Sequence, residues 1–68
     1  MKVYFFDELM NMSVNQLLDL LSMYIKLRDD IFMLMKAEPE MREFYIENNI
    51  YFYLLNITKI KNTLEVKL

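Results

Sequence analysis

Residues 13–37, SVNQLLDLLSMYIKLRDDIFMLMKA, contain the strongest structural pattern in this chain. The segment begins with a capping box, because the side chains of Ser13 and Gln16 can each bond to the backbone of the other at the start of a helix. From there, apolar side chains recur with heptad spacing at two positions, which predicts an amphipathic helix over residues 14–37. The two positions are filled by Leu17, Tyr24 and Ile31 and by Leu20, Leu27 and Leu34.

A second helix is predicted from Pro39 onward. Proline disfavours a helical residue before it and suits the first turn of a helix, so the first helix should end just before it. Apolar side chains then recur at spacings of three and four, which favours one helix over about residues 39–61. The β-branched and aromatic residues within 48–61 are also compatible with a strand, with the Asn pair at 48–49 as a break. The apolar stripe of this half consists of Ile46, Ile50, Tyr53, Ile57 and Ile60, and continues to Leu64.

Both ends of the chain are predicted to be short β-strands. Residues 2–6 are β-prone, and residues 64–68 alternate apolar and charged side chains. Two antiparallel helices joined at Pro39 bring these ends together, and pairing across a dimer is favoured because an isolated two-stranded ribbon is weak. The predicted fold is therefore mainly α: a two-helix antiparallel hairpin with short terminal strands, in which residues 1–68 form a single domain.

Bulky apolar side chains are unusually frequent for a chain of 68 residues. It contains 11 Leu, 7 Met, 6 Ile, 5 Phe and 5 Tyr, against a single Ala. A chain this short buries only about 60% of the surface that its unfolded form exposes. Disulfides and zinc sites with Cys or His ligands cannot support it, because both residues are absent. We therefore expect the two apolar stripes to form a core or a homodimer surface, with a second copy or another protein as the partner.

The composition excludes most classes of enzyme. Without His or Cys there is no conventional nucleophile–base pair, and without Gly there is no phosphate-binding loop, so no catalysis, metal or cofactor is expected. A net charge of −2 argues against direct nucleic-acid binding. The longest segment without charged residues, 48–58, is too short to span a bilayer, and acidic residues follow the N-terminus too closely for a signal peptide. We expect a cytoplasmic protein that does not bind a membrane.

Acidic residues are concentrated in the middle of the chain. The segment Asp29–Glu47 contains six acidic and two basic residues, a local net charge of −4. It surrounds the predicted bend, and it is interpreted either as an ordinary solvated surface or as a surface that meets a basic partner. The candidate partner-binding residues of this acidic bend are Asp29, Asp30, Glu38, Glu40, Glu43 and Glu47.

Residues 16–21, QLLDLL, form the most specific short motif. They resemble the hexapeptide with which bacterial proteins bind the DNA sliding clamp: a Gln, two free positions, a small or acidic residue, a Leu and an apolar residue. The resemblance implies that Gln16 makes polar contacts and that Leu20 and Leu21 enter an apolar pocket of the clamp. The competing interpretation is a capping-box Gln followed by leucines of the core.

In size and composition the chain also resembles small phage proteins that disable the replication or transcription machinery of their host. The resemblance implies a host protein as the partner, with the bacterial sliding clamp as the best single target. The central channel of a clamp is lined with basic side chains, so the acidic bend could inhibit it by steric and electrostatic occlusion. The alternatives are a structural or assembly dimer of a mobile element and an antitoxin-like binding protein.

Overall fold

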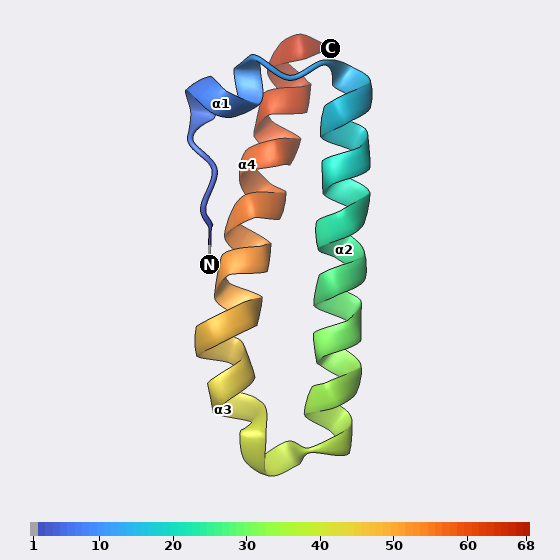
Figure 1. Ribbon diagram of the computed structural model, residues 1–68, viewed down its shortest axis with the longest axis vertical. Coiled ribbons are helices and arrows are strands. Elements are labelled where there is room, and N and C mark those ends of the chain that lie inside the picture. The colour runs from blue at the N-terminus through green and yellow to red at the C-terminus, as the bar shows by residue number, and fades with distance from the viewer. Residues whose placement is uncertain (1) are drawn as a thin grey trace.

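Helix α2 (Val14–Ala37) is the first half of a helical hairpin in the computed structural model of the chain, which describes residues 2–68 (Figure 1). A short helix, α1 (Phe6–Met10), precedes α2 and packs on the last helix. The second half returns antiparallel to α2, and the hairpin measures 40 × 17 × 15 Å. In chain order, this half consists of a 3₁₀ turn η1 (Pro39–Met41), helix α3 (Arg42–Tyr45), a π-helical turn η2 (Ile46–Ile50) and helix α4 (Tyr51–Lys67).

The start of α2 is fixed by the predicted capping box. The hydroxyl of Ser13 accepts a hydrogen bond from the backbone N–H of Gln16 at 3.1 Å, and the side-chain oxygen of Gln16 accepts from the Ser13 N–H at 2.9 Å. These bonds satisfy two backbone donors that a helix start otherwise leaves without partners. The predicted helix over residues 14–37 is confirmed.

The bend between the two halves is built around Glu38 and Pro39. The backbone of Glu38 leaves the helical conformation (φ −129°, ψ 69°), and its N–H donates to the carbonyl of Leu34 at 2.8 Å. Pro39 is the first residue of η1, a position at which a helix does not need the N–H that proline lacks. The hydroxyl of Tyr45 donates to the Glu38 carboxylate at 2.9 Å. This bond ties the end of α2 to α3 across the bend.

The segment that was compatible with helix or strand is helical, and the Asn pair lies in the π turn η2. The N–H of Tyr51 bonds to the carbonyl of Ile46, five residues earlier, so this turn holds one residue more than an α-helical turn. The extra residue shifts the side chains that precede it around the helix axis, so they no longer align with the apolar stripe of α4. Ile46 is therefore 36% exposed, and Tyr45, half-buried, takes the inward position that the sequence assigned to Ile46.

The two predicted terminal strands are wrong, since residues 2–68 contain no strand. Residues 64–67 are the last turn of α4, because Leu64 lies one helical turn beyond Ile60 and its burial in the core outweighs the alternating pattern of the segment. Residues 2–5 are extended, but their backbone bonds to side chains of α4, and Phe6 begins α1. The second helical half therefore extends to Lys67, beyond the predicted end at residue 61.

The buried core lies in the half of the hairpin near the two chain ends. No residue from Ile25 to Asn49 is buried, so the half near the bend is held by partly buried side chains only. Two polar side chains, Asn56 and Thr63, are fully buried in α4, and Thr63 donates to the Lys59 carbonyl at 2.8 Å. The apolar core cluster consists of Leu9, Leu17, Tyr24, Tyr53, Ile57, Ile60 and Leu64.

The heptad stripe of α2 faces α4 at its start and turns away toward the bend. Leu17 and Tyr24 are buried, and Leu20, Leu27 and Ile31 are partly buried against the core. Leu34, however, is 42% exposed. A straight α-helix drifts by about 20° per heptad relative to a strict seven-residue repeat. The inward position near the bend therefore passes from Leu34 to Met35, which is half-buried.

Candidate functional site

The bend carries a surface that is both acidic and apolar. Glu40, Glu43 and Glu47 are exposed on η1, α3 and η2, at spacings of three and four residues that place them on neighbouring turns. Within residues 2–68, none of these three carboxylates makes a hydrogen bond or an ion pair. They are the carboxylates of the acidic bend that are available to a partner.

The other three predicted acidic residues already have partners within the chain. Asp29 pairs with Arg28 at 3.1 Å, and Asp30 pairs with Lys26 at 3.4 Å. Glu38 accepts the hydrogen bond from Tyr45, and this bond, together with burial, raises the pKa of the Tyr45 hydroxyl. The structure therefore groups four of the six predicted residues at the bend, three of them without a partner in the chain, and leaves Asp29 and Asp30 higher on α2 in exposed ion pairs.

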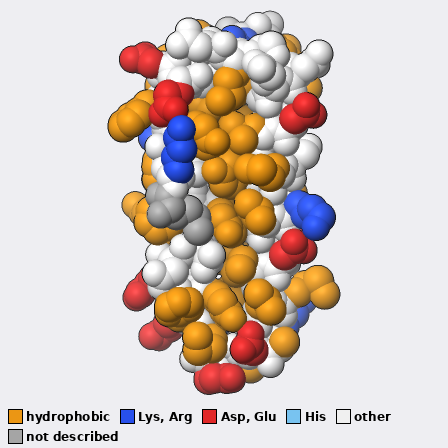
Figure 2. Space-filling model, in the orientation of Figure 1, with side chains coloured by type: hydrophobic (Ala, Val, Ile, Leu, Met, Phe, Trp, Pro, Cys, Tyr) orange, Lys and Arg blue, Asp and Glu red, His pale blue; other side chains and the backbone are white. Residues whose placement is uncertain are grey.

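Large apolar side chains are exposed beside these carboxylates. Figure 2 shows hydrophobic and acidic side chains next to one another at the bend end, which is the lower end in this view. Such side chains are common here because no buried core lies beneath them. The exposed apolar side chains of this end, with their exposed fractions, are Phe32 (40%), Met33 (71%), Leu34 (42%), Phe44 (53%) and Ile46 (36%).

One open hollow at this end is lined by basic and apolar side chains instead of acidic ones. It has a volume of about 360 Å³ and is lined by Phe32, Met35, Lys36 and Arg42. Its two cations and two apolar side chains interrupt the acidic surface between α2 and α3. The bend is thus acidic on one side and carries a small basic hollow, which the local net charge of the segment did not reveal.

The clamp-like motif forms the first turns of α2 and is not extended. Both the backbone and the side chain of Gln16 are occupied by the capping box with Ser13. Gln16 and Leu20 line one open hollow of about 360 Å³, together with Met12, Asp19 and Met23. Leu21 is one residue further around the helix, about 100° away, and does not line this hollow. Binding as an extended peptide requires the start of α2 to unwind.

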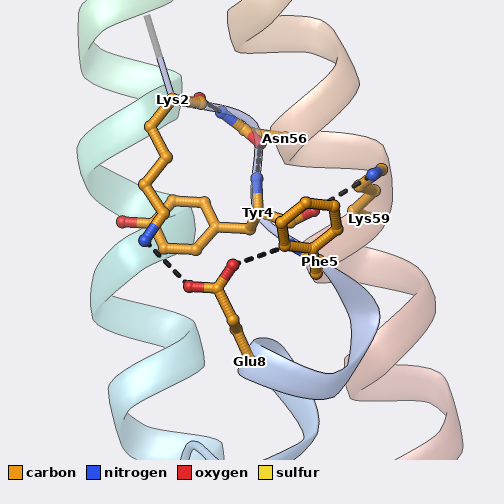
Figure 3. A network of polar contacts seen from close by, with 6 residues as sticks. All are labelled: Lys2, Tyr4, Phe5, Glu8, Asn56 and Lys59. Atoms are coloured by element: carbon orange, nitrogen blue, oxygen red, sulfur yellow. Dashed lines mark hydrogen bonds and ion pairs between the residues drawn. The ribbon is translucent and has the colours of Figure 1, made fainter.

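An N-terminal arm, residues 2–10, is held against α4 by a polar network that the sequence did not predict (Figure 3). The fully buried side chain of Asn56 accepts from the Tyr4 N–H at 3.0 Å and donates to the Lys2 carbonyl at 2.9 Å. The ammonium group of Lys59 donates to the Tyr4 carbonyl at 3.0 Å, and that of Lys67 donates to the Met12 carbonyl. The side chain of Asn56 thus makes hydrogen bonds to the extended backbone of the arm, as the backbone of a neighbouring β-strand does.

An ion pair closes this network on the side of α1. The ammonium group of Lys2 lies 2.8 Å from one carboxylate oxygen of Glu8, and the other oxygen accepts from the Phe5 N–H at 3.2 Å. The bond from Lys2, and then that from Phe5, lower the pKa of the Glu8 carboxyl, and the same ion pair raises the pKa of Lys2. The Lys2 ammonium group also lies 4.5 Å from the centre of the Tyr4 ring.

Three tyrosines join the arm to both helices of the hairpin. The ring of Tyr24 on α2 lies 6.1 Å from that of Tyr4, edge to face, and 6.0 Å from that of Tyr53 on α4. Tyr24 is 6% exposed, and burial is the main cause that raises the pKa of its hydroxyl to about 12. This cluster is the place where arm, α2 and α4 meet.

We expect the hydroxyl of Tyr24 to ionise well above the usual pKa of a tyrosine. Its pKa rises from 10.0 in the unfolded chain to about 12 in the folded one, so unfolded chains release this proton first and the folded state loses stability as the pH rises through this interval. A titration followed by ultraviolet absorbance should show a late step that is absent in Tyr24→Phe. Tyr51→Phe, at an exposed position, should retain it. A late step that survives in Tyr24→Phe contradicts this assignment.

Nothing in residues 2–68 resembles a metal centre, since these residues contain no group of three or more acidic side chains close enough to hold an ion. Among the helices of the same residues, none combines the length and the apolar character needed to cross a membrane. No protein-family model, curated protein or solved structure matches the chain, so the candidate sites rest on its own residues.

Proposed function

We propose that the chain is a non-enzymatic protein that binds and inhibits a macromolecular machine of a host cell through the acidic bend. The observation that carries this proposal is the coincidence, at one end of an elongated hairpin, of three unpaired carboxylates with five exposed apolar side chains. Carboxylates guide the approach to a basic partner surface and fix the relative orientation of the two proteins. Apolar side chains contribute affinity once water is excluded from the interface.

The loose packing near the bend suits this role. No side chain from Ile25 to Asn49 is buried, so residues here can change conformation without opening the core near the chain ends. Met33 and Met35 lie in this region, and methionine adapts its shape to varied partners. A partner can therefore reshape the acidic bend at a small cost in folding free energy.

The bacterial sliding clamp is the first target to test, because its DNA-facing channel is a basic surface. In this proposal, the acidic bend occupies sites that otherwise meet DNA phosphates, and inhibition is steric and electrostatic. Gln16, Leu20 and Leu21 are a less favoured anchor, since their helical conformation and the bonds of Gln16 oppose extended binding.

Reversing the three unpaired charges, Glu40→Lys, Glu43→Lys and Glu47→Lys, is expected to weaken clamp binding by about 100-fold. The estimate takes about 1 kcal/mol for each exposed charge. The control reverses Asp7 and Glu65, which lie away from the bend and outside the clamp-like motif; it is compared with the double variant Glu43→Lys and Glu47→Lys, which gives the same net charge, and it should change the dissociation constant by less than about 3-fold. Calorimetry with purified clamp measures both, and circular dichroism checks the fold.

The outcomes separate the target from the mechanism. Failure of the unchanged protein to bind the clamp removes this target. Binding that the reversal at the bend leaves intact removes the electrostatic mechanism, and equal losses in both variants show that net charge alone is recognised. Added salt should weaken the interaction, because the carboxylates at the bend are exposed.

A structural dimer is a second candidate function, and the exposed apolar surface favours it. Outside the bend, Leu18, Met23, Leu54 and Tyr51 are each more than 40% exposed. Light scattering separates the two candidates in part, since oligomers larger than a dimer favour an assembly protein and a plain dimer favours the inhibitor.

A further inference from the structure

We propose that the second half of the hairpin exchanges between two forms. In the π form, described above, η2 is a π turn and Tyr45 takes the inward position. In the α form, η2 becomes a regular α-helical turn and Ile46 takes that position. π turns inside helices are rare and are frequent at functional sites. The proposal concerns the conformation of the free protein and does not depend on the proposed function.

Two side-chain hydrogen bonds hold the π form. The Tyr45 hydroxyl donates to the Glu38 carboxylate at 2.9 Å, and the side-chain amide of Asn48 donates to the Phe44 carbonyl at 2.8 Å. In a regular α-helix, the backbone N–H of Asn48 itself donates to that carbonyl, four residues earlier. The α form therefore satisfies the Phe44 carbonyl as well, and the bond from Tyr45 is the one that it gives up.

The apolar stripe of the sequence favours the α form. Ile46 lies four residues before Ile50, the spacing that places both on one face of a regular helix, yet in the π form it is 36% exposed. The α form buries it in line with the rest of the stripe. The conversion needs only small changes of backbone angle, because Tyr45, Ile46, Ile50 and Tyr51 all have right-handed helical angles already.

The charges around the hollow between α2 and α3 also favour the α form. Lys36 and Arg42 line this hollow together, and within residues 2–68 neither makes an ion pair. When the π turn becomes regular, each residue before it moves to about the place of its predecessor. Glu43 then reaches the place of Arg42, which brings an unpaired carboxylate beside Lys36. The two forms thus exchange one hydrogen bond against one ion pair and one buried Ile.

The packing near the bend leaves room for this movement. No residue from Ile25 to Asn49 is buried, so the core near the chain ends stays closed. The one-residue shift, about 1.5 Å along the helix axis, is taken up at the bend, where Glu38 and Met41 already leave the regular helix. Side chains of α3 turn by about 100° around the helix axis. The bend therefore presents a different surface in each form, with Tyr45 outward and Glu43 paired in the α form.

A pair of lysine variants tests the two forms by their hydrogen bonds. Tyr45→Lys disfavours the π form, which places this side chain inward, so the Tyr51 N–H should bond to the Glu47 carbonyl, four residues earlier. Ile46→Lys adds the same charge and favours the π form, so Tyr51 should keep its bond to the carbonyl of residue 46. Nuclear magnetic resonance identifies the acceptor through the coupling between amide nitrogen and carbonyl carbon across the bond. A Tyr51 amide that bonds to the carbonyl of residue 46 in both variants overturns the proposal.

Exchange in the unchanged protein is the second measurement, and it decides if the bend of Tyr45→Lys unfolds. Relaxation dispersion of residues 42–50 should show a minor form populated at about 1–10%. Tyr45→Phe removes the bond to Glu38 and should raise the ratio of minor to major form about 10-fold, whereas the exposed Tyr51→Phe should leave it unchanged. Deletion of Asn48 removes the extra residue of the π turn, gives a regular helix with Tyr45 still inward, and should abolish the exchange. Flat profiles in Tyr45→Phe, or exchange that persists after the deletion, overturn the proposal.

Discussion

Replacing Ile60 by alanine is expected to lower the free energy of unfolding by about 3 kcal/mol, within the range measured for buried Ile and Leu. Ile60 is fully buried in the middle of α4 and belongs to the core cluster with Leu17 and Ile57. For a 68-residue chain the whole stability is roughly 3–10 kcal/mol, so this one change removes a large share of it. Urea denaturation followed by circular dichroism measures the effect.

The matched control for this experiment is Leu54→Ala on the same helix. Leu54 is 43% exposed, and its replacement should cost less than about 1 kcal/mol. An equal loss in both variants contradicts the core described for the single chain and points to a protein surface that covers Leu54.

Asn56→Ala is expected to cost about 2 kcal/mol and to release the N-terminal arm. The change removes two hydrogen bonds, to the Lys2 carbonyl and from the Tyr4 N–H, each worth about 1 kcal/mol. Hydrogen exchange at the Tyr4 amide should accelerate strongly, while amides within α2 should respond only to the change in overall stability. Asn62→Ala, exposed on the same helix, should affect neither quantity. A Tyr4 amide that stays protected in Asn56→Ala refutes the role assigned to this side chain.

The parts of the fold that the sequence predicted are those with local causes. Ser13 and Gln16 fix the start of α2, and Pro39 fixes the position of the bend, because each acts on neighbouring backbone. The terminal strands were predicted incorrectly, since the pattern of residues 64–68 also allows a helix that places Leu64 in the core. Tertiary packing decided between these two, and a local pattern does not contain it.

Two further features could not be predicted from local sequence patterns. The π turn moved Ile46 out of the stripe, and no local pattern distinguishes it from a regular turn containing Asn48 and Asn49. Asn56 binds residues more than 50 positions away. The only indication in the sequence is its place between Tyr53 and Ile60 on the apolar side of α4, where a buried amide needs partners.

The acidic bend was predicted in part. The concentration of charge was visible in the sequence, but the ion pairs of Asp29 and Asp30 with their neighbours follow from the arrangement of side chains on α2. The exposed apolar side chains around Glu43 follow from the absence of a core beneath them. The sequence therefore identified the region, and the structure identified which of its side chains a partner can reach.

The position of the core has a consequence for how this chain can change over evolutionary time. Near the bend, the two halves are joined by the peptide chain, the Tyr45–Glu38 hydrogen bond and partly buried side chains, while at the other end they are joined by the buried core and the N-terminal arm. Substitutions near the bend should therefore have small effects on folding, so the sequence of this end can vary with few structural constraints. Substitutions of the buried side chains of α4, from Tyr53 to Leu64, remain restricted, because those side chains keep the hairpin closed.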